Sequence, residues 1–147
     1  MDLWEKYKNE SDQTICIIGI LILSAKICIA DGHFSEFEKD EILKILPHEP
    51  RQRKILINIL DEAIADKNDV EYHAIRIKKF ISDNKDFLEF IIAVLYRLGH
   101  SDHVYSKEED IEIKKVADVF GIKKNFIQSL KESIRSFFSK GGLKVNA

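Results

Sequence analysis

One sequence pattern occurs twice in this chain, and it constrains the fold more than any other feature. Residues 31–38 read Asp-Gly-His-Phe-Ser-Glu-Phe-Glu, and residues 102–109, which lie 71 positions later, read Asp-His-Val-Tyr-Ser-Lys-Glu-Glu. Over the aligned segments 31–46 and 102–117, six of sixteen positions are identical, where chance would give about one. The recurrence indicates an internal duplication.

The duplication predicts a domain built from two related helical units. The apolar pattern before each motif stays in phase, so that Ile20 aligns with Ile91. Each unit is expected to contain a buried helix, a tight turn and an amphipathic helix, with repeat one at about 12–65 and repeat two at about 83–138. We expect a pseudo-twofold axis to relate the two units.

The predicted fold class is all-α, with about seven helices in one compact bundle. Only two prolines and six glycines occur in 147 residues, which favours long helices over a sandwich of many short strands. Caps and breakers place the helical segments at about 12–30, 36–46, 51–65, 70–81, 85–99, 106–120 and 124–138. Residues 1–147 are expected to form a single domain, with 139–147 as a flexible tail and with Trp4 and Tyr7 packing a short lead-in segment onto the bundle.

Two of these segments, 15–25 and 87–98, are almost wholly apolar. The first is apolar for eleven residues before Lys26, fewer than the roughly 20 that span a bilayer. A helix that is apolar on all sides has to be surrounded by other helices. We therefore expect both helices to be buried all round and to pack against each other as the core of the duplication.

The charge balance bears on the kind of molecule that this protein binds, and the cysteines bear on its cellular compartment. The chain has 23 basic and 25 acidic residues, for a net charge of -2, and its lysines are mixed with acids along the chain. A nucleic-acid binder usually concentrates a basic excess on one face, so nucleic acid is not an expected partner. Cys16 and Cys28 stand twelve residues apart on one predicted helix, roughly 18 Å at 1.5 Å per residue and too far for a disulfide. The expected location is the reducing cytoplasm.

The repeated motif has a structural explanation. Ser35 with Glu38, and Ser106 with Glu109, each form Ser-x-x-Glu, the capping box that satisfies orphan amides at the start of a helix. Gly32 would let the chain reverse after the first helix. Capping alone could therefore account for the pattern.

The same motif also matches the second half of an EF-hand calcium loop. The first half is missing, because Ile27 and Ile29 stand where the first two carboxylates of that loop would be. Calcium takes six to eight oxygens, so neither copy alone is an EF-hand. A composite site stays open as a second interpretation, in which packing of the repeats brings the acidic residues of both motifs together.

The motifs resemble those of the TerB-like family, which includes the tellurite-resistance protein TerB and the N-terminal domain of DjlA-type membrane co-chaperones. Residues 30–38 are similar to the family's Ala-Asp-Gly-x-[apolar]-Ser-x-x-Glu, and the resemblance spans about 15–130. His103 stands in the second motif where the family usually has glycine. The resemblance implies a helical bundle with a divalent-cation site (calcium, manganese or zinc) formed by Asp31, Glu38, Asp102 and Glu109.

No catalytic signature accompanies these motifs. The sequence contains no glycine-rich phosphate loop, nucleophile elbow or His-Glu-x-x-His pattern. His100 and His103 flank Asp102, but a zinc site there would have no cysteine or third histidine nearby in sequence.

We therefore expect a non-enzymatic stress-response or interaction module of the TerB-like kind, related to tellurite resistance. Its expected partner is a protein, with a second copy of the chain as one candidate. The alternatives are a dedicated metal-binding protein and the regulatory N-terminal domain of a DjlA-like co-chaperone. The latter would carry a membrane anchor and a J-domain, yet the chain has no such anchor and no His-Pro-Asp triplet.

Overall fold

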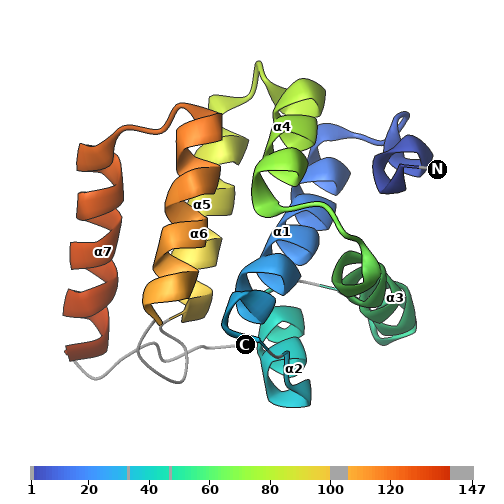
Figure 1. The fold of residues 1–147 in the computed structure, drawn as a ribbon, viewed down its shortest axis with the longest axis horizontal. Helices are drawn as coiled ribbons and strands as arrows, with labels where there is room; N and C mark the ends of the chain where they lie inside the picture. The colour runs from blue at the N-terminus through green and yellow to red at the C-terminus, as the bar shows by residue number, and fades with distance from the viewer. Residues whose placement is uncertain (1, 33, 47, 100–105, 140–147) are drawn as a thin grey trace.

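The computed structural model of this protein is an all-α bundle (Figure 1). It describes residues 2–32, 34–46, 48–99 and 106–139. Within these ranges the helices are α1 Asp12–Cys28, α2 Glu36–Ile45, α3 Arg53–Ala65, α4 Val70–Ile81, α5 Lys85–Gly99, α6 Lys107–Phe120 and α7 Lys124–Ser139. Three 3-10 helices are η1 Leu3–Tyr7, η2 Ile29–Asp31 and η3 Pro50–Gln52. The fold class and all seven helices predicted from the sequence are confirmed.

None of the described helices is long and apolar enough to cross a membrane. The apolar segment in α1 is instead the centre of the bundle, where α1 packs against α3, α4 and α5 and also contacts α2 and α6. The side chains of Ile20, Leu21 and Ile22 are fully buried. A surface helix needs only one apolar stripe. Other helices surround α1, so its apolar side chains are buried on every side.

Helix α5 departs from the sequence-based expectation. It packs against α1, and Leu88, Ile91 and Leu95 are buried, but it is not buried all round. Phe90 is 53% exposed, and Asp86 and Arg97 are exposed on the same stripe of the helix. The prediction of two equally buried helices is therefore wrong for α5, which is amphipathic.

A single aligned position explains part of this difference. The 71-residue offset places Gly19 of α1 opposite Phe90 of α5. A Cβ atom at Gly19 would lie 2.9 Å from Ile77 Cδ1, so the bare backbone there lets α4 approach α1 closely. On α5 the aligned position is Phe90, whose side chain is exposed, and no comparable close approach is described there. The two units thus differ in their packing, and the pseudo-twofold relation stays a prediction.

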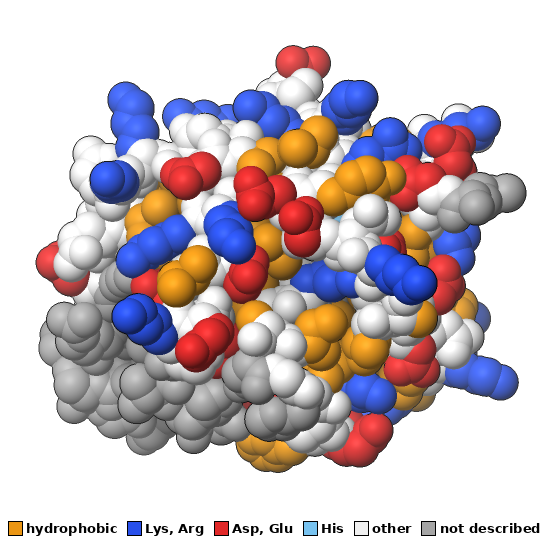
Figure 2. Space-filling model, in the orientation of Figure 1, with side chains coloured by type: hydrophobic (Ala, Val, Ile, Leu, Met, Phe, Trp, Pro, Cys, Tyr) orange, Lys and Arg blue, Asp and Glu red, His pale blue; other side chains and the backbone are white. Residues whose placement is uncertain are grey.

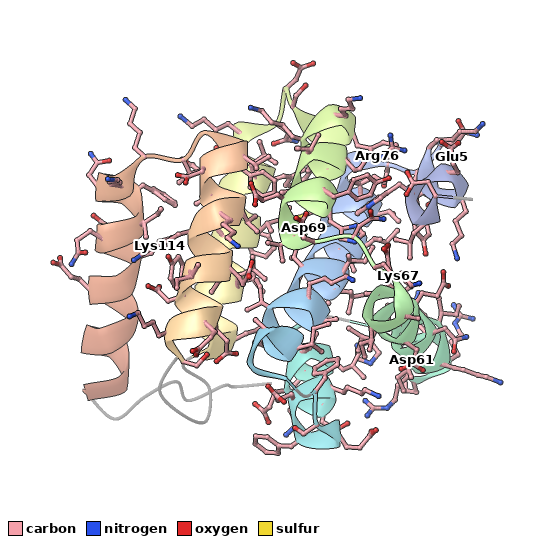
Figure 3. All side chains as sticks on the ribbon, in the orientation of Figure 1. Glu5, Asp61, Lys67, Asp69, Arg76 and Lys114 are labelled. Atoms are coloured by element: carbon pink, nitrogen blue, oxygen red, sulfur yellow. The ribbon has the colours of Figure 1, made fainter. Side chains whose placement is uncertain are left out.

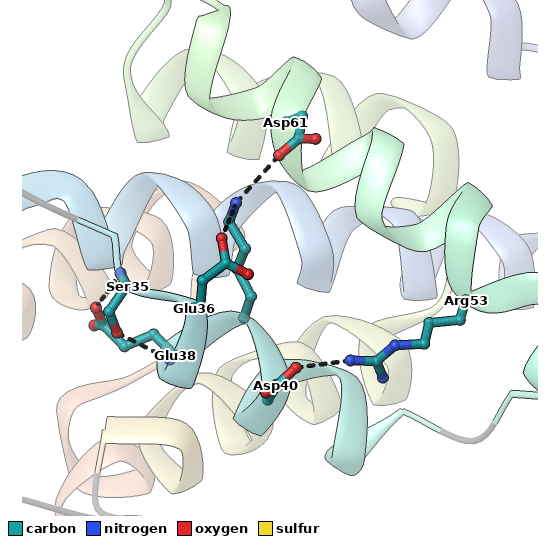
Figure 4. Close-up of polar contacts among 7 residues, drawn as sticks. Ser35, Glu36, Glu38, Asp40, Arg53 and Asp61 are labelled. Atoms are coloured by element: carbon teal, nitrogen blue, oxygen red, sulfur yellow. Dashed lines mark hydrogen bonds and ion pairs between the residues drawn. The ribbon is translucent and has the colours of Figure 1, made fainter.

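Exposed ion pairs connect α2 to α3 (Figure 4). The Asp40 carboxylate lies 2.7 Å from the Arg53 guanidinium, and the Lys39 ammonium lies 3.4 Å from Asp61 and 3.3 Å from Glu36. Exposed pairs of this kind contribute at most about 1 kcal/mol each. They orient α2 relative to α3, while Ile42 and Leu43 bury its apolar face.

The surface carries mixed charge. On the face shown in Figure 2, lysine and arginine side chains alternate with aspartate and glutamate, and apolar side chains lie between them. This distribution agrees with the near balance of 23 basic and 25 acidic residues.

Candidate metal centre

Both copies of the motif form the predicted capping boxes. At α2, the Ser35 hydroxyl accepts from the Glu38 N–H at 3.1 Å, and Glu38 Oε1 accepts from the Ser35 N–H at 2.9 Å (Figure 4). At α6, the corresponding distances are 3.0 Å and 3.1 Å for Ser106 and Glu109. Each glutamate is therefore held in place at the start of its helix by two reciprocal hydrogen bonds.

The turn between α1 and α2 directs Glu38 back toward the end of α1. Gly32 has φ +105°, in the left-handed region that favours glycine. It ends the short 3-10 helix η2 and reverses the chain, as the sequence predicted. Phe34, the aromatic residue before Ser35, packs against the core.

Three side chains from three helices meet at this end of the bundle. Ligand atoms of Cys28, Glu38 and Glu109 all lie within 4.8 Å of one another. Cys28 is the last residue of α1, Glu38 lies in the first turn of α2 and Glu109 lies in the first turn of α6. In Figure 1 the end of α1 and the beginnings of α2 and α6 lie at the lower end of the bundle.

Two of the four acidic residues singled out from the sequence are thus placed together. Glu38 and Glu109, which come from different motifs, are neighbours in this cluster. The backbone of Asp31 ends η2, whereas its side chain and the whole of Asp102 lie outside the described residues, as do His100 and His103.

Cys28 is the member that sequence analysis missed. It belongs to neither capping box, and its spacing from Cys16 on the helix indicated only that the two cysteines form no disulfide. The packing of α6 against the end of α1 and against η2 places it beside the glutamates. This contact joins residues 81 positions apart in sequence, since 109 minus 28 is 81, and no local pattern encodes it.

The cluster gathers acidic groups at a largely buried place. Glu109 is only 3% exposed, and Cys28 and Glu38 are half-buried. The partial positive charge at a helix N-terminus stabilises each carboxylate separately. Carboxylate oxygens within 4.8 Å of each other repel, and a cation bound between them would offset that repulsion.

The donor set fits some metals better than others. One sulfur and two carboxylates are ligands that zinc accepts in four-coordinate sites. A carboxylate has about four lone-pair positions, so a capping hydrogen bond to one oxygen does not prevent coordination. Calcium, which takes six to eight oxygens and no thiolate, fits this trio poorly.

The other cysteine is chemically different. Cys16 is 3% exposed in the core, and burial raises the pKa of its thiol to about 11. A thiol in that state is inert, because the thiolate is the form that binds metals and reacts.

Comparison with protein families agrees with this architecture. The family described as tellurite resistance protein TerB matches residues 18–132, a span that contains Cys28, Glu38 and Glu109. The chain belongs to the TerB family. Comparison with curated proteins and with solved structures gives no match. The TerB resemblance that the two motifs suggested is therefore confirmed at the level of the family.

Proposed function

We propose that this TerB-family protein is a non-enzymatic interaction module that binds a divalent metal ion through Cys28, Glu38 and Glu109. The observation that supports the proposal is the convergence of the two motif glutamates and one thiol within 4.8 Å. Capping alone requires each glutamate to reach its own serine, but it does not require the two glutamates to meet.

The preferred ion is zinc, with manganese next and calcium last. A thiolate is a soft ligand that suits zinc, whereas manganese and calcium favour oxygen. Three protein ligands leave the fourth position of a tetrahedral zinc site open. The family resemblance offers Asp31 or Asp102 for it, and a side chain of a partner protein is another source.

Metal binding would join the ends of three helices. Cys28, Glu38 and Glu109 lie in α1, α2 and α6, so an ion bound to all three cross-links elements that are distant in sequence. A ligand that binds only the folded state stabilises it, by about 2.7 kcal/mol at a hundred times its dissociation constant. We propose that the ion fixes this end of the bundle for a protein partner, in a stress response of the kind that the family description names. A thiol that is free to bind an ion is typical of a reducing compartment, and we propose a cytoplasmic location on that ground.

The decisive experiment separates metal binding from capping. Glutamine can replace glutamate in a capping box, because its side-chain oxygen still accepts the hydrogen bond from the serine N–H. The variant E38Q/E109Q therefore keeps both caps and removes both carboxylates. Calorimetric titration with zinc, manganese and calcium should show tight zinc binding to the natural chain and at least a tenfold loss in this variant, as removing charged ligands predicts.

The matched control is E36Q/E108Q. Glu36 and Glu108 lie in the first turns of the same two helices and are exposed, so this variant changes the net charge equally without touching the cluster. It should bind zinc like the natural chain. Absence of micromolar binding by the natural chain, or equal losses in the two double variants, would refute the metal site.

A further inference from the structure

A short segment before α1, residues 2–7, is held onto the bundle by its side chains. Its backbone hydrogen bonds, such as Glu5 N–H to the Asp2 carbonyl, stay within the segment and its continuation. Trp4 anchors it, with a side chain that is 0% exposed and lies 5.8 Å from the Phe80 ring of α4. Lys6 pairs with Glu62 at the exposed rim.

The anchor also makes one hydrogen bond in the interior. Trp4 Nε1 donates to His73 Nδ1 at 3.0 Å, and the His73 side chain is 0% exposed. An indole N–H can only donate, so Nδ1 has to be the unprotonated, accepting nitrogen of the imidazole. The bond therefore exists only while His73 is neutral.

The groups around His73 act in opposite directions on its charge. Asp66 Oδ2 lies 3.4 Å from the other ring nitrogen, Nε2, and Asp2 and Asp69 also favour the protonated ring. Lys26 of α1, whose ammonium donates to the Asp66 carbonyl, opposes protonation. On α4 itself, the titratable and charged residues within three positions of His73 are Glu71, Tyr72 and Arg76.

Burial has the largest effect on the pKa of His73. Desolvation is the largest influence on His73 and lowers its pKa from 6.5, ahead of the attraction of Asp66. The docked state therefore keeps the ring neutral at pH 7, and the indole hydrogen bond is intact.

We propose that the Trp4–His73 hydrogen bond is a pH-sensitive latch, which releases residues 2–7 from α4 when His73 takes up a proton. A proton on Nδ1 places two N–H donors against each other and adds a charge to a buried site. Once the segment is released, water can reach the ring. Water and the Asp66 carboxylate beside Nε2 then stabilise the protonated His73.

The direction of the pH dependence follows from linkage. Well above 6.5, the ordinary pKa of a histidine, the ring is neutral in both states, so docking is fully favourable. As the pH falls below 6.5, the released state binds the proton more readily than the docked state, because burial has lowered the docked pKa. Docking is therefore weakened progressively in mild acid, in the range where histidines act as switches.

Beyond the burial of Trp4, the polar contacts of the segment add little to its docking. Arg76 Nη2 lies 2.8 Å from Asp2 Oδ2 and 3.7 Å from Glu5 Oε1 (Figure 3), but Arg76 is 25% exposed, and partly exposed ion pairs are weak. Asp2, Leu3 and Lys6 also form one wall of an open pocket of 530 Å³, whose other wall contains Glu62, Ala65, Asp66 and Asn68. Release would open this pocket and uncover His73 and Phe80.

The chain contains one tryptophan, so Trp4 emission reports the latch directly. In a titration of the full chain from about pH 8 to about pH 4.5, emission should shift to the red below pH 6.5. The far-ultraviolet circular dichroism should stay unchanged over the same range. Emission and helicity that change together would mean global acid unfolding and would overturn the proposal.

The variant H73Q isolates the titrating group. Glutamine offers an oxygen acceptor to the indole N–H and takes up no proton in this range, so the red shift should disappear. The control is H48Q. The His48 side chain is half-buried and lies with Nδ1 2.8 Å from the Leu46 carbonyl oxygen, in another part of the chain from Trp4, so this variant should keep the shift. An unchanged transition in H73Q would contradict the latch.

Hydrogen exchange on the natural chain keeps the test independent of whether H73Q folds. After correction for the intrinsic pH dependence of exchange, amides of residues 2–8 should lose at least about tenfold protection below pH 6.5. Amides of α1 and α4 should keep their protection. Uniform loss across all three segments, or none in residues 2–8, would refute the proposal.

Discussion

At the scale of single residues, Glu38 and Glu109 form the two capping boxes, and the proposed metal site would use the same two side chains. Each glutamate closes a capping box with its own serine, and the two side chains also meet beside Cys28. The capping bonds restrict both carboxylates, so a metal site formed by them would be preorganised. A preorganised site loses less side-chain entropy when a ligand binds.

The caps themselves can be tested one residue at a time. Ser35→Ala and Ser106→Ala should each lower the free energy of unfolding by about 1 kcal/mol, within a range of roughly 0.5–2 kcal/mol, because each leaves a helix-initial amide without its acceptor. Ser→Asp at the same positions should restore most of the loss, since aspartate also caps. Chemical denaturation gives these values.

Ser82→Ala is the control for the cap prediction, because Ser82 is exposed at the end of α4 and caps no helix start. Its effect should stay within about 0.5 kcal/mol. Equal effects at all three serines would mean that the capping bonds contribute no net stability.

At the scale of elements, α1 and α4 pack closely where Gly19 meets Ile77. Gly19 faces the fully buried Ile77, and a Cβ at position 19 would lie 2.9 Å from Cδ1 and 3.3 Å from Cγ1 of that side chain. Alanine is the better helix former by about 1 kcal/mol. Helix propensity therefore does not explain a glycine at position 19, whereas the close packing of Ile77 does.

Gly19→Ala should lower the free energy of unfolding by about 1 kcal/mol, because overpacking costs about 1–3 kcal/mol and exceeds the gain in helix propensity. In an Ile77→Val background, which removes Cδ1, the same change should become neutral or stabilising. A double-mutant cycle measured by denaturation checks this coupling. Additive effects would show that the two side chains do not compete for space.

At the scale of the whole molecule, α1 is the helix around which the others are arranged. It contacts α2, α3, α4, α5 and α6, and the core cluster runs from Trp4 to Ile127. Helix α5 shares this core on one side while its other side faces water. Stability should therefore depend strongly on buried positions of both helices.

Ile20→Ala and Ile91→Ala should each cost on the order of 2–5 kcal/mol, as large-to-small changes do in a packed core, because both side chains are 0% exposed. The exposed Lys78 is the comparison site, and Lys78→Ala should stay within about 0.5 kcal/mol. Thermal and denaturant unfolding measure all three. A cost below about 1 kcal/mol at Ile91 would place α5 outside the cooperative core.

The sequence by itself determined the local features of this protein. Ser-x-x-Glu specifies a helix start because its hydrogen bonds join residues three positions apart, and both caps are present as predicted. Gly32 and Gly121 mark chain reversals because both need positive φ. The scarcity of breakers and the apolar segment of α1 likewise indicated a helical bundle with that helix inside it.

Only the tertiary structure decided which of these features meet. The apolar content of α5 resembles that of α1, but burial depends on which neighbours cover a face. Among the described residues, no helix covers the stripe that contains Phe90. Cys28 joins the two glutamates, and Trp4 reaches His73 across 69 positions, through contacts between helices that no local spacing encodes. Hydrogen bonds within a turn can be recognised in the sequence, whereas contacts between distant side chains depend on how whole helices pack.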